Sequence, residues 1–423
     1  MSSESLYPLK PLNVAVCGCG PAGLAAALLL RRDGHRVTIF ERFETPRPVG
    51  SGIIVQPTGL GVLVELGLIR DVLACGARID RLFGRVLPSR RVVLDVRYSA
   101  LGRGWHGVAL QRSALFGLLH QAATQAGIGI VAGVELTGIE RGGGQTTPLG
   151  RGGRRLGSFD LVVDALGARS PLAAARVRRK ILPYGALWAN IPWPGGSFIS
   201  NALEQRYLRA RRMAGILPIG SSGAGEPRLA AFFWSLRRDQ FEAWRSRPLA
   251  EWKAEVEQLW PEAAAAAAGI TDHAQLVFAQ YDHFTLGMPC SEGLVHIGDA
   301  GRSTSPQLGQ GANMALLDAL ALARALRSAG ALQERLSSYR RLRFWHVRLF
   351  QAASAMFTPF YQSDSRVLPW VRDWLAAPIS RLPVGDIVLA RLVAGMTVAP
   401  LGSSAFNPYR ESAGEAAVVV RGP

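Results

Sequence analysis

The sequence predicts an α/β protein with a Rossmann-like domain, an inserted mixed β-sheet and a C-terminal helical region. Near the N-terminus, a Gly-rich turn joins a short β-branched run to an apolar, helix-like stretch. Near residue 300, a second turn rich in Gly and Pro again separates an apolar run from a helix-like run. Between the two turns lie aromatic, strand-like pieces separated by Pro and Gly, which indicate a sheet inserted into the first domain.

The first turn has the context of a dinucleotide-binding fingerprint. Asn13–Val16 and His35–Phe40 are expected to be strands on either side of a helix, and an acid follows the second strand. Glycines at these spacings make the turn, admit a pyrophosphate and let the helix pack on the strand, and the helix N-terminus faces the phosphates. The acid would accept hydrogen bonds from ribose hydroxyls, which favours FAD or NAD over NADP. The predicted contacts are Gly18, Gly20, Pro21, Ala22, Gly23, Glu41 and Arg42.

The second turn is the most informative stretch of the chain. It begins at Gly298-Asp299, continues through Pro306 to Gly309–Asn313, and leads into the helix-like run Met314–Arg327. A carboxylate at a strand end, a proline turn, spaced glycines and a new helix N-terminus describe a backbone that approaches a polar ligand closely.

This stretch resembles the second flavin fingerprint of the single-component flavoprotein aromatic hydroxylases, the p-hydroxybenzoate hydroxylase-like family. The resemblance covers most of residues 13–330 and implies one FAD site, in a domain of the glutathione reductase type, built from both turns. In that family the residue at Asp299 holds a ribityl hydroxyl, and the turn from Pro306 to Asn313 lies along the isoalloxazine ring. The family's backbone carbonyl at Pro306 helps to guide oxygen transfer, so Pro306 is the catalytic candidate. The resemblance implies FAD contacts at Asp299, Gly309, Gly311, Ala312 and Asn313.

Two arginines and one altered motif extend the comparison with the family. Arg112 matches an arginine that touches the phosphate and ribityl region, and Arg47 matches one that often contacts FAD. For Arg47, a solvated arginine between two prolines is an equal alternative. Arg302 stands where the family usually has His, and Asp164–Gly167 matches only part of the family's Asp-Gly motif. Because that motif is implicated in NAD(P)H binding, the partial match weakens the case for direct NADPH use.

The resemblance implies an FAD-dependent monooxygenase that takes electrons from NAD(P)H and forms a flavin C4a-hydroperoxide with O2. Its substrate would be an aromatic or quinol-like small molecule, hydroxylated in a site that excludes water. A catalytic base is not assigned among candidates that include Tyr184, Tyr207 and His283. Two alternatives stay open: a reductase or dehydrogenase of the same fold, for example acting on an isoprenoid, and a non-catalytic FAD-binding partner protein.

Length, charge and cysteines limit the class of protein. The chain has 423 residues, more than the roughly 250–300 residues at which a single hydrophobic core stops growing, so two domains are expected. The net charge is +17, but no nucleic-acid-binding motif accompanies the scattered arginines, so no nucleic-acid partner is expected. The four cysteines lack metal-ligand or disulfide spacing, so no metal site is expected. Without a signal-like N-terminus or a membrane-length apolar run, a cytoplasmic location is expected.

The chain is predicted to divide into four parts. Residues 11–180 and 275–330 form the FAD-binding domain, 181–274 the inserted substrate-binding sheet, 331–404 the C-terminal helical region and 405–423 a tail. Trp188, Phe232 and Trp234 are candidates for an aromatic substrate site, with ordinary core packing as the alternative. The amphipathic helices after residue 366 are expected to pack on the FAD-binding domain, and peripheral membrane contact is the alternative.

Overall fold

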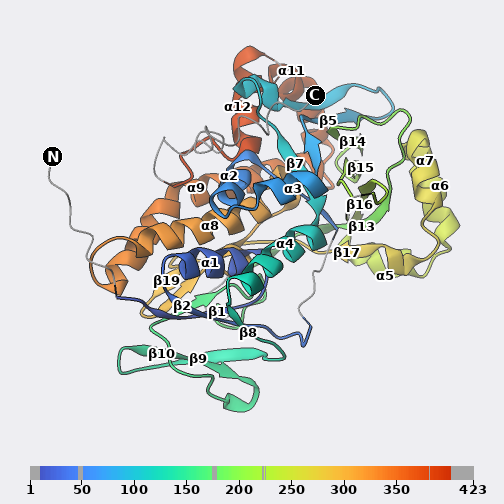
Figure 1. The fold of residues 1–423 in the computed structure, drawn as a ribbon. Coiled ribbons are helices and arrows are strands. Elements are labelled where there is room, and N and C mark those ends of the chain that lie inside the picture. Colours follow the sequence, from blue (N-terminus) through green and yellow to red (C-terminus); the bar gives the residue numbers. More distant parts are fainter. Residues whose placement is uncertain are drawn as a thin grey trace.

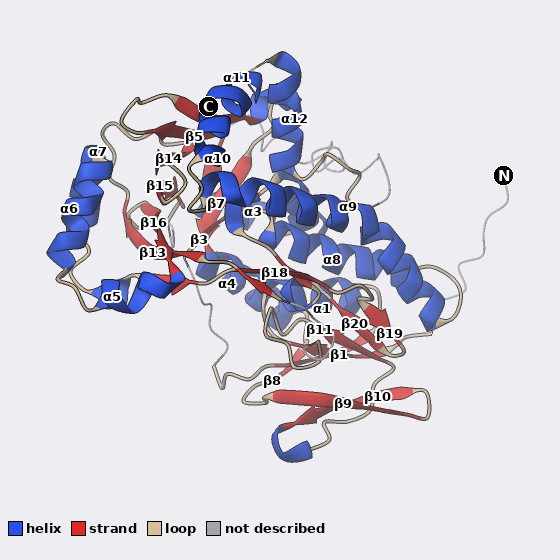
Figure 2. Cartoon of the chain, turned by 180° about the vertical axis from the view of Figure 1, so that it is seen from behind, coloured by secondary structure: helices blue, strands red, loops and turns tan. Residues whose placement is uncertain are grey.

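The computed structural model describes residues 10–45, 51–173, 179–380 apart from Ser222 and Ala224, and 382–401. Arg47 and the predicted tail 405–423 lie outside these described residues. Figures 1 and 2 show two groups of strands with helices around them, and the C-terminal helices at one end of the molecule.

The first group is a six-stranded sheet whose central strand carries the N-terminal Gly-rich turn. All its neighbouring strands pair in parallel except the edge strand β19, which pairs antiparallel with β20. Buried Val, Ile, Leu and Ala residues fill the central strands, as expected for a sheet covered on both faces. The strand order is β19 (Cys290–Ser291), β20 (Leu294–His296), β11 (Leu161–Asp164), β1 (Asn13–Cys17), β2 (Arg36–Phe40) and β8 (Gly129–Val131).

Helices that follow the two Gly-rich turns pack against each other beside this sheet. Helix α1 (Pro21–Arg32) contacts α4 (Arg112–Gln125) and α8 (Gly311–Leu326), and α8 also contacts the long helix α9 (Leu332–Tyr361). Their buried faces are rich in Ala and Leu, which lets the helix backbones approach closely. The N-termini of α1 and α8 are thereby fixed relative to the sheet.

The second group is a seven-stranded sheet. Helices α5 (Phe241–Arg245), α6 (Leu249–Leu259) and α7 (Pro261–Ala268) follow its strand β16, and a core of tryptophans joins the sheet to them. The strand order is β17 (Val277–Ala279), β13 (Tyr184–Pro192), β16 (Leu229–Arg237), β15 (Arg212–Pro218), β14 (Ala202–Leu208), β5 (Arg81–Val86) and β6 (Val92–Arg97).

Short sheets and helices connect the two groups. Helices α2 (Pro57–Glu65) and α3 (Ile69–Cys75) lie between strands β3 and β4 in the chain. One three-stranded sheet joins β3 (Gly52–Val55), β7 (Gly107–Gln111) and β4 (Ala77–Ile79). The other joins β12 (Lys180–Ile181), β18 (Asp282–Thr285) and β21 (Arg302–Ser303), and a hairpin is formed by β9 (Leu136–Gly142) and β10 (Gln145–Gly150).

Two segments have features that the local sequence alone does not show. The stretch 141–157 is rich in Gly and Arg, yet β10 begins inside it and buries Thr146 and Thr147. The stretch 240–268 forms three helices rather than one, because Pro248 and Pro261 interrupt it. The domain division stays a prediction, and β5 and β6 of the larger sheet come from the part assigned to the FAD-binding domain.

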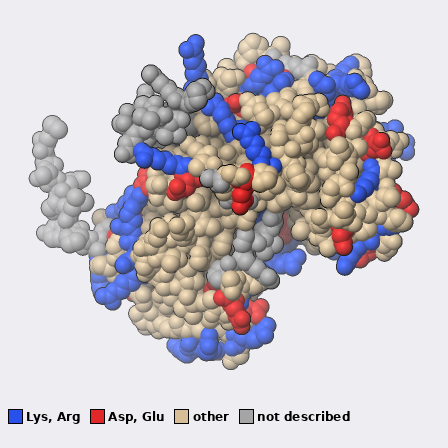
Figure 3. Space-filling view, turned by 45° about the vertical axis from the view of Figure 1, so that its right-hand side comes forward, with Lys and Arg blue, Asp and Glu red and all other residues tan. Residues whose placement is uncertain are grey.

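On the face shown in Figure 3, charged side chains are spread out rather than gathered in one strip. Lys and Arg side chains are scattered over the face shown in Figure 3, with Asp and Glu between them. Among the described residues, no helix is long and apolar enough to cross a membrane, and no cluster of His, Cys, Asp or Glu could hold a metal ion.

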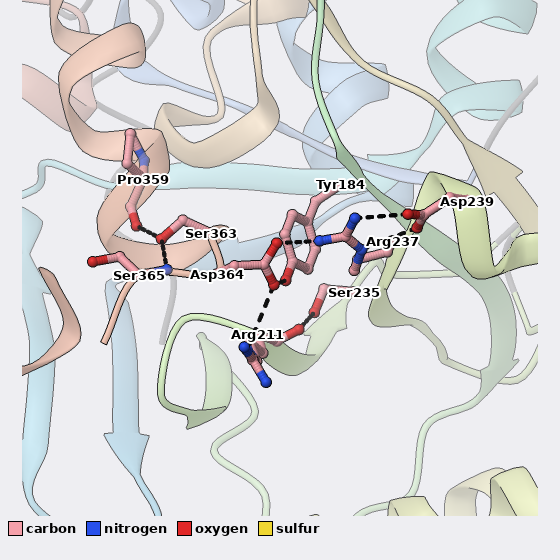
Figure 4. Close-up of polar contacts among 9 residues, drawn as sticks. All are labelled: Tyr184, Arg211, Ser235, Arg237, Asp239, Pro359, Ser363, Asp364 and Ser365. Carbon is pink, nitrogen blue, oxygen red and sulfur yellow. Dashed lines mark hydrogen bonds and ion pairs between the residues drawn. The ribbon is translucent and has the colours of Figure 1, made fainter. Parts of the chain in front are cut away.

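A polar cluster lies around Asp364, in the segment between α9 and the C-terminal helices. Asp364 accepts hydrogen bonds from the Tyr184 hydroxyl at 2.8 Å and from Arg237, and pairs with Arg211 at 3.5 Å (Figure 4). These partners belong to the seven-stranded sheet or its turns, so they tie the segment after α9 to that sheet. Helix α10 (Val367–Val371), a π-helical turn (Arg372–Ala376), α11 (Ala377–Ser380) and α12 (Pro383–Ala394) follow.

The C-terminal end of α12 is hydrogen-bonded to the second Gly-rich turn and to helix α2. The Gln310 side-chain amide donates to the Val393 carbonyl at 2.6 Å, and the Thr58 hydroxyl donates to the Ala394 carbonyl at 3.2 Å. The Nε2 atom of His346, on α9, lies 2.9 Å from the Gly395 carbonyl oxygen. The C-terminal region therefore contacts both groups of strands, and not only the part of the chain that carries the Gly-rich turns.

A pH dependence of stability is expected from His346. Burial, together with the positive charge of the neighbouring Arg343, lowers its pKa to about 2. The folded state therefore keeps His346 neutral, while the unfolded chain binds a proton below about pH 6.5. As the pH falls below that value, the free energy of unfolding should fall by about 1.4 kcal/mol per pH unit from this group. Denaturant titrations at several pH values check this.

The matched control is His346→Gln. His35, His106 and His283 also have lowered pKa values because of burial, so they act in the same direction in both proteins. Below pH 6.5, the free energy of unfolding of the variant should fall less steeply with falling pH than that of the parent, by about 1.4 kcal/mol per pH unit, the contribution of one proton. An identical slope in both proteins would exclude His346 as a source of acid sensitivity.

Candidate active site

One large cavity runs from the first Gly-rich turn to the C-terminal helices. Its volume of 1810 Å³ exceeds the roughly 300–1,000 Å³ of a pocket for one small ligand, so it has room for a large cofactor and a substrate. Most of the predicted site residues line it. They are Gly18, Gly20, Pro21, Ala22, Glu41, Arg42, Arg112, Asp299, Pro306, Gly309, Gly311 and Ala312.

At one end of the cavity the Gly-rich turn exposes the N-terminus of α1. Gly18 has φ of 108°, and a Cβ there would lie 2.5 Å from the Ala165 carbonyl oxygen of the neighbouring strand's end. Nothing lies within 4 Å of the position of a Cβ on Gly20, so space is open beside the turn. Pro21 begins the helix without an N–H to satisfy. Free N–H groups and the helix dipole make this a site for a phosphate group.

Glu41 closes the same end of the cavity. One of its carboxylate oxygens accepts from the Cys19 N–H at 2.8 Å, and the other accepts from the Phe43 N–H at 3.1 Å. The next residue, Arg42, is exposed and places its guanidinium 4.6 Å from the centre of the Phe43 ring. The acid is thus held at the end of β2, next to the phosphate-binding turn.

Midway along the cavity, Asp299 faces Arg112. Protein atoms surround Asp299 on most sides, yet its side chain is exposed to the open cavity. Burial raises the pKa of its carboxyl, while the positive charges of Arg112 and Arg302 oppose that rise. Arg112 begins α4, and its backbone N–H donates to the Ser51 carbonyl at 3.0 Å. Two distant stretches of sequence therefore place a carboxylate and a guanidinium group in the lining of one cavity.

The Pro306 turn is anchored from behind. The Ser305 N–H donates to Nε2 of His283 at 2.9 Å, and the Ser305 hydroxyl lies 2.5 Å from Thr358 and 3.1 Å from Ser354. These contacts bind the turn to β18 and α9, so the exposed ring of Pro306 has a fixed position at the cavity wall.

The helix N-terminus after this turn is open to the cavity. Gly309 has φ of 61°, and Gly311 is exposed with nothing within 4 Å of a Cβ position. Asn313 does not line the cavity: its side chain accepts from the Gln56 N–H at 2.8 Å and donates to the Gly309 carbonyl at 3.1 Å. Gly23 also lies outside the cavity lining, packed against the Gly18 backbone.

These features fit FAD as one elongated ligand. The N-terminus of α1 suits a pyrophosphate, and Glu41, Asp299 and the N-terminus of α8 line the same cavity. The open space beside Gly20 and Gly311 supplies the close backbone approach that such a ligand needs.

The altered Asp164 motif has a structural role. Asp164 is fully buried and accepts from the Ser170 hydroxyl at 2.6 Å and from the Leu166 N–H at 3.1 Å. It also lies 2.6 Å from Nδ1 of His296. Its carboxylate thus shapes the loop 165–171 that lines the cavity but does not face the cavity itself.

Arg302, at the position where the family has His, takes part in a buried ion network. Asp318 pairs with Arg302 and with Arg343, the latter at 2.8 Å, and also accepts from the Gly298 N–H at 2.8 Å. All three charged side chains are buried. The network therefore fixes the start of the second Gly-rich turn, and its members Gly298 and Arg302 also line the cavity.

The other half of the cavity is mostly apolar. Trp188 lines it, with its indole N–H donating to the Tyr281 hydroxyl at 2.9 Å and its ring 4.8 Å from Phe233. Phe232 and Trp234 do not line it; they point to the other face of the sheet, where both pack on Trp252. Of the three predicted aromatic residues, only Trp188 is therefore placed for substrate.

None of the three named candidates for a base is free in the cavity. Tyr184 lies outside the lining, and burial and Asp364 raise its pKa to about 12. The Tyr207 hydroxyl donates to the Gln205 side chain at 2.6 Å, and burial raises its pKa. His283 accepts the Ser305 N–H behind the Pro306 turn.

Sequence reasoning missed part of the cavity wall. The C-terminal helices contribute Ile379, Val388 and Leu392 to the lining, although their apolar pattern alone does not say what they cover. Gln56 was also missed. Its side-chain amide oxygen accepts from the Tyr98 hydroxyl, and Gln56 lines the cavity beside Gly309. Its position just before Pro57, at the start of a helix, was the available signal.

Comparisons with known proteins show the family. The family model described as FAD binding domain matches residues 11–350. Aurachin C monooxygenase/isomerase of Stigmatella aurantiaca is 26% identical over 92% of this chain and 99% of its own. The 6-methylpretetramide 4-monooxygenase of Streptomyces rimosus is 25% identical over 93% of this chain and 95% of its own.

A solved structure confirms the fold. HpxO of Klebsiella pneumoniae, complexed with FAD and uric acid, aligns with a TM-score of 0.75 over 95% of this chain and all of its own, at 18% identity. The expected resemblance to aromatic hydroxylases and the expected cofactor, FAD, are confirmed. The chain therefore belongs to the FAD binding domain family, and its relatives identify it as a flavoprotein monooxygenase.

Proposed function

We propose that this protein uses NAD(P)H and O2 to hydroxylate an aromatic or quinol-like small molecule. The observation that carries the proposal is the continuity of the cavity: a polar cleft that fits FAD opens into an apolar chamber lined by Trp188 and Phe233. The Pro306 turn lines the same cavity. Relatives named for the monooxygenation of aurachin C and 6-methylpretetramide support the substrate class.

The chain's own residues would bind FAD, orient the substrate and exclude water from the site. The turn at Gly18–Gly23, with Glu41 and Arg42, would hold the adenosine diphosphate half of FAD; Arg47 is proposed on resemblance alone. Asp299 and Arg112 would hold the ribityl chain and phosphate, and the backbone of Gly309–Asn313 would lie along the ring system. FAD would supply the oxygen-transfer chemistry. The apolar chamber would exclude water and hold the substrate ring against the Pro306 turn.

The test follows NAD(P)H oxidation and O2 consumption by the FAD-loaded protein across phenols, salicylates and quinolones, with released peroxide recorded. A substrate should accelerate both rates and suppress peroxide, because oxygen is then transferred rather than lost. Turnover of a compound without O2 would instead indicate a reductase. If no compound were turned over, either with O2 or without it, the protein would be a non-catalytic FAD-binding protein.

A further inference from the structure

The C-terminal helices carry an unusually exposed apolar surface. Seven of its side chains are more than half exposed, and we call them the C-terminal apolar face. They are Val367 (66%), Trp370 (56%), Trp374 (54%), Ile379 (61%), Leu382 (58%), Val384 (74%) and Val388 (52%). Soluble proteins rarely expose this many large apolar side chains on neighbouring turns, so the face calls for an occupant.

The helices themselves are well packed underneath. Ala390, Leu392, Val393 and Ala394 of α12 are buried, and α12 contacts strand β6 and the turn that follows it. The helices therefore have one face built into the protein and a second, apolar face that no described residue covers.

The cavity reaches this face. Ile379 and Val388 both line the cavity and are more than half exposed. They lie on α11 and α12, which contact each other. A molecule that enters between these helices crosses apolar side chains on its way to the chamber lined by Trp188.

Arginines border the face. Arg90, Arg366 and Arg391 are exposed and form no ion pair with another described residue. The Arg91 guanidinium lies 3.5 Å from the centre of the Trp374 ring. Tryptophans and arginines around an apolar patch suit the boundary between lipid headgroups and acyl chains, and the net charge of +17 favours an anionic surface.

We propose that the C-terminal apolar face docks on an anionic lipid bilayer, with the cavity mouth between α11 and α12 turned toward the lipid. The substrate would then be an amphiphile, an aromatic head with an apolar chain, that passes from the bilayer into the chamber. The substrate claim rests on the proposed function, whereas docking does not. A water-soluble substrate would gain nothing from an apolar, arginine-bordered mouth.

Flotation of the full-length, FAD-loaded protein with lipid vesicles tests the docking. Vesicles of equal parts phosphatidylcholine and phosphatidylglycerol should carry the protein upward, and vesicles of phosphatidylcholine alone should carry less. Val384→Asp combined with Trp370→Asp should weaken binding about tenfold, because two inserted apolar side chains become charged. Neither residue lines the cavity, so FAD content should stay unchanged.

Met288→Asp is the matched control. Met288 is 54% exposed and lies in the connection between β18 and β19. Strand β19 lies away from α11 and α12 in Figures 1 and 2, so this variant should float like the parent. Equal binding of parent and double variant would overturn the proposal. So would a dimer, seen by light scattering, that the double variant dissociates, because a second copy would then occupy the face.

Discussion

Replacing Asp318 with alanine is expected to lower the free energy of unfolding by about 3–5 kcal/mol, the usual cost of removing one partner from a buried ion pair. The carboxylate pairs with Arg302 and Arg343 and accepts the Gly298 N–H, and all these groups are buried. Its loss leaves two guanidinium groups without their counter-charge. Denaturant titration of parent and variant measures the change.

Asp33→Ala is the control for this prediction. Asp33 also pairs with an arginine, Arg327, at 2.8 Å, but that arginine is 40% exposed. Removing an exposed pair should cost less than about 1 kcal/mol. If Asp318→Ala were no more harmful than Asp33→Ala, the buried network would not be what fixes the second Gly-rich turn.

Asp299→Ala is expected to weaken FAD binding about tenfold to 150-fold. A hydrogen bond from a ligand hydroxyl to a carboxylate contributes roughly 1.5–3 kcal/mol, and each 1.4 kcal/mol is about a factor of ten in affinity. The variant also leaves Arg112 without the nearby negative charge. Titrating the apoprotein with FAD, followed by quenching of flavin fluorescence, gives the dissociation constants.

Asp71→Ala makes the same change at an exposed position of α3, outside the cavity, and should bind FAD like the parent. Asp299→Asn separates charge from hydrogen bonding, because it keeps an acceptor and should recover part of the loss. Parent-like affinity in Asp299→Ala would remove Asp299 from the FAD site.

The two Gly-rich turns could be predicted from sequence because their chemistry is local. A strand, glycines at fixed spacing and a helix N-terminus define a phosphate-binding turn within about a dozen residues. The fold joins the two turns through contacts between α1 and α8, so residues from Gly18 to Ala312 line one cavity.

Long-range partners were harder to predict. A strand's alternation shows that Phe232 and Phe233 face opposite sides, but it does not say which side meets the cavity and which meets α6. The apolar stripe of α12 shows that one face is buried, yet not that it meets β6. Arg302 was recognised as a departure from the family, but its partner Asp318 becomes visible only in the folded chain.

Incorporation of oxygen from O2 tests the central claim most directly. The FAD-loaded protein, NAD(P)H and the aromatic compound that best couples oxidation to low peroxide release are incubated under isotopically labelled dioxygen, and the product is analysed by mass spectrometry. The proposed function predicts one labelled oxygen atom in each product molecule. A product whose new oxygen comes from water, or that gains none, would contradict it.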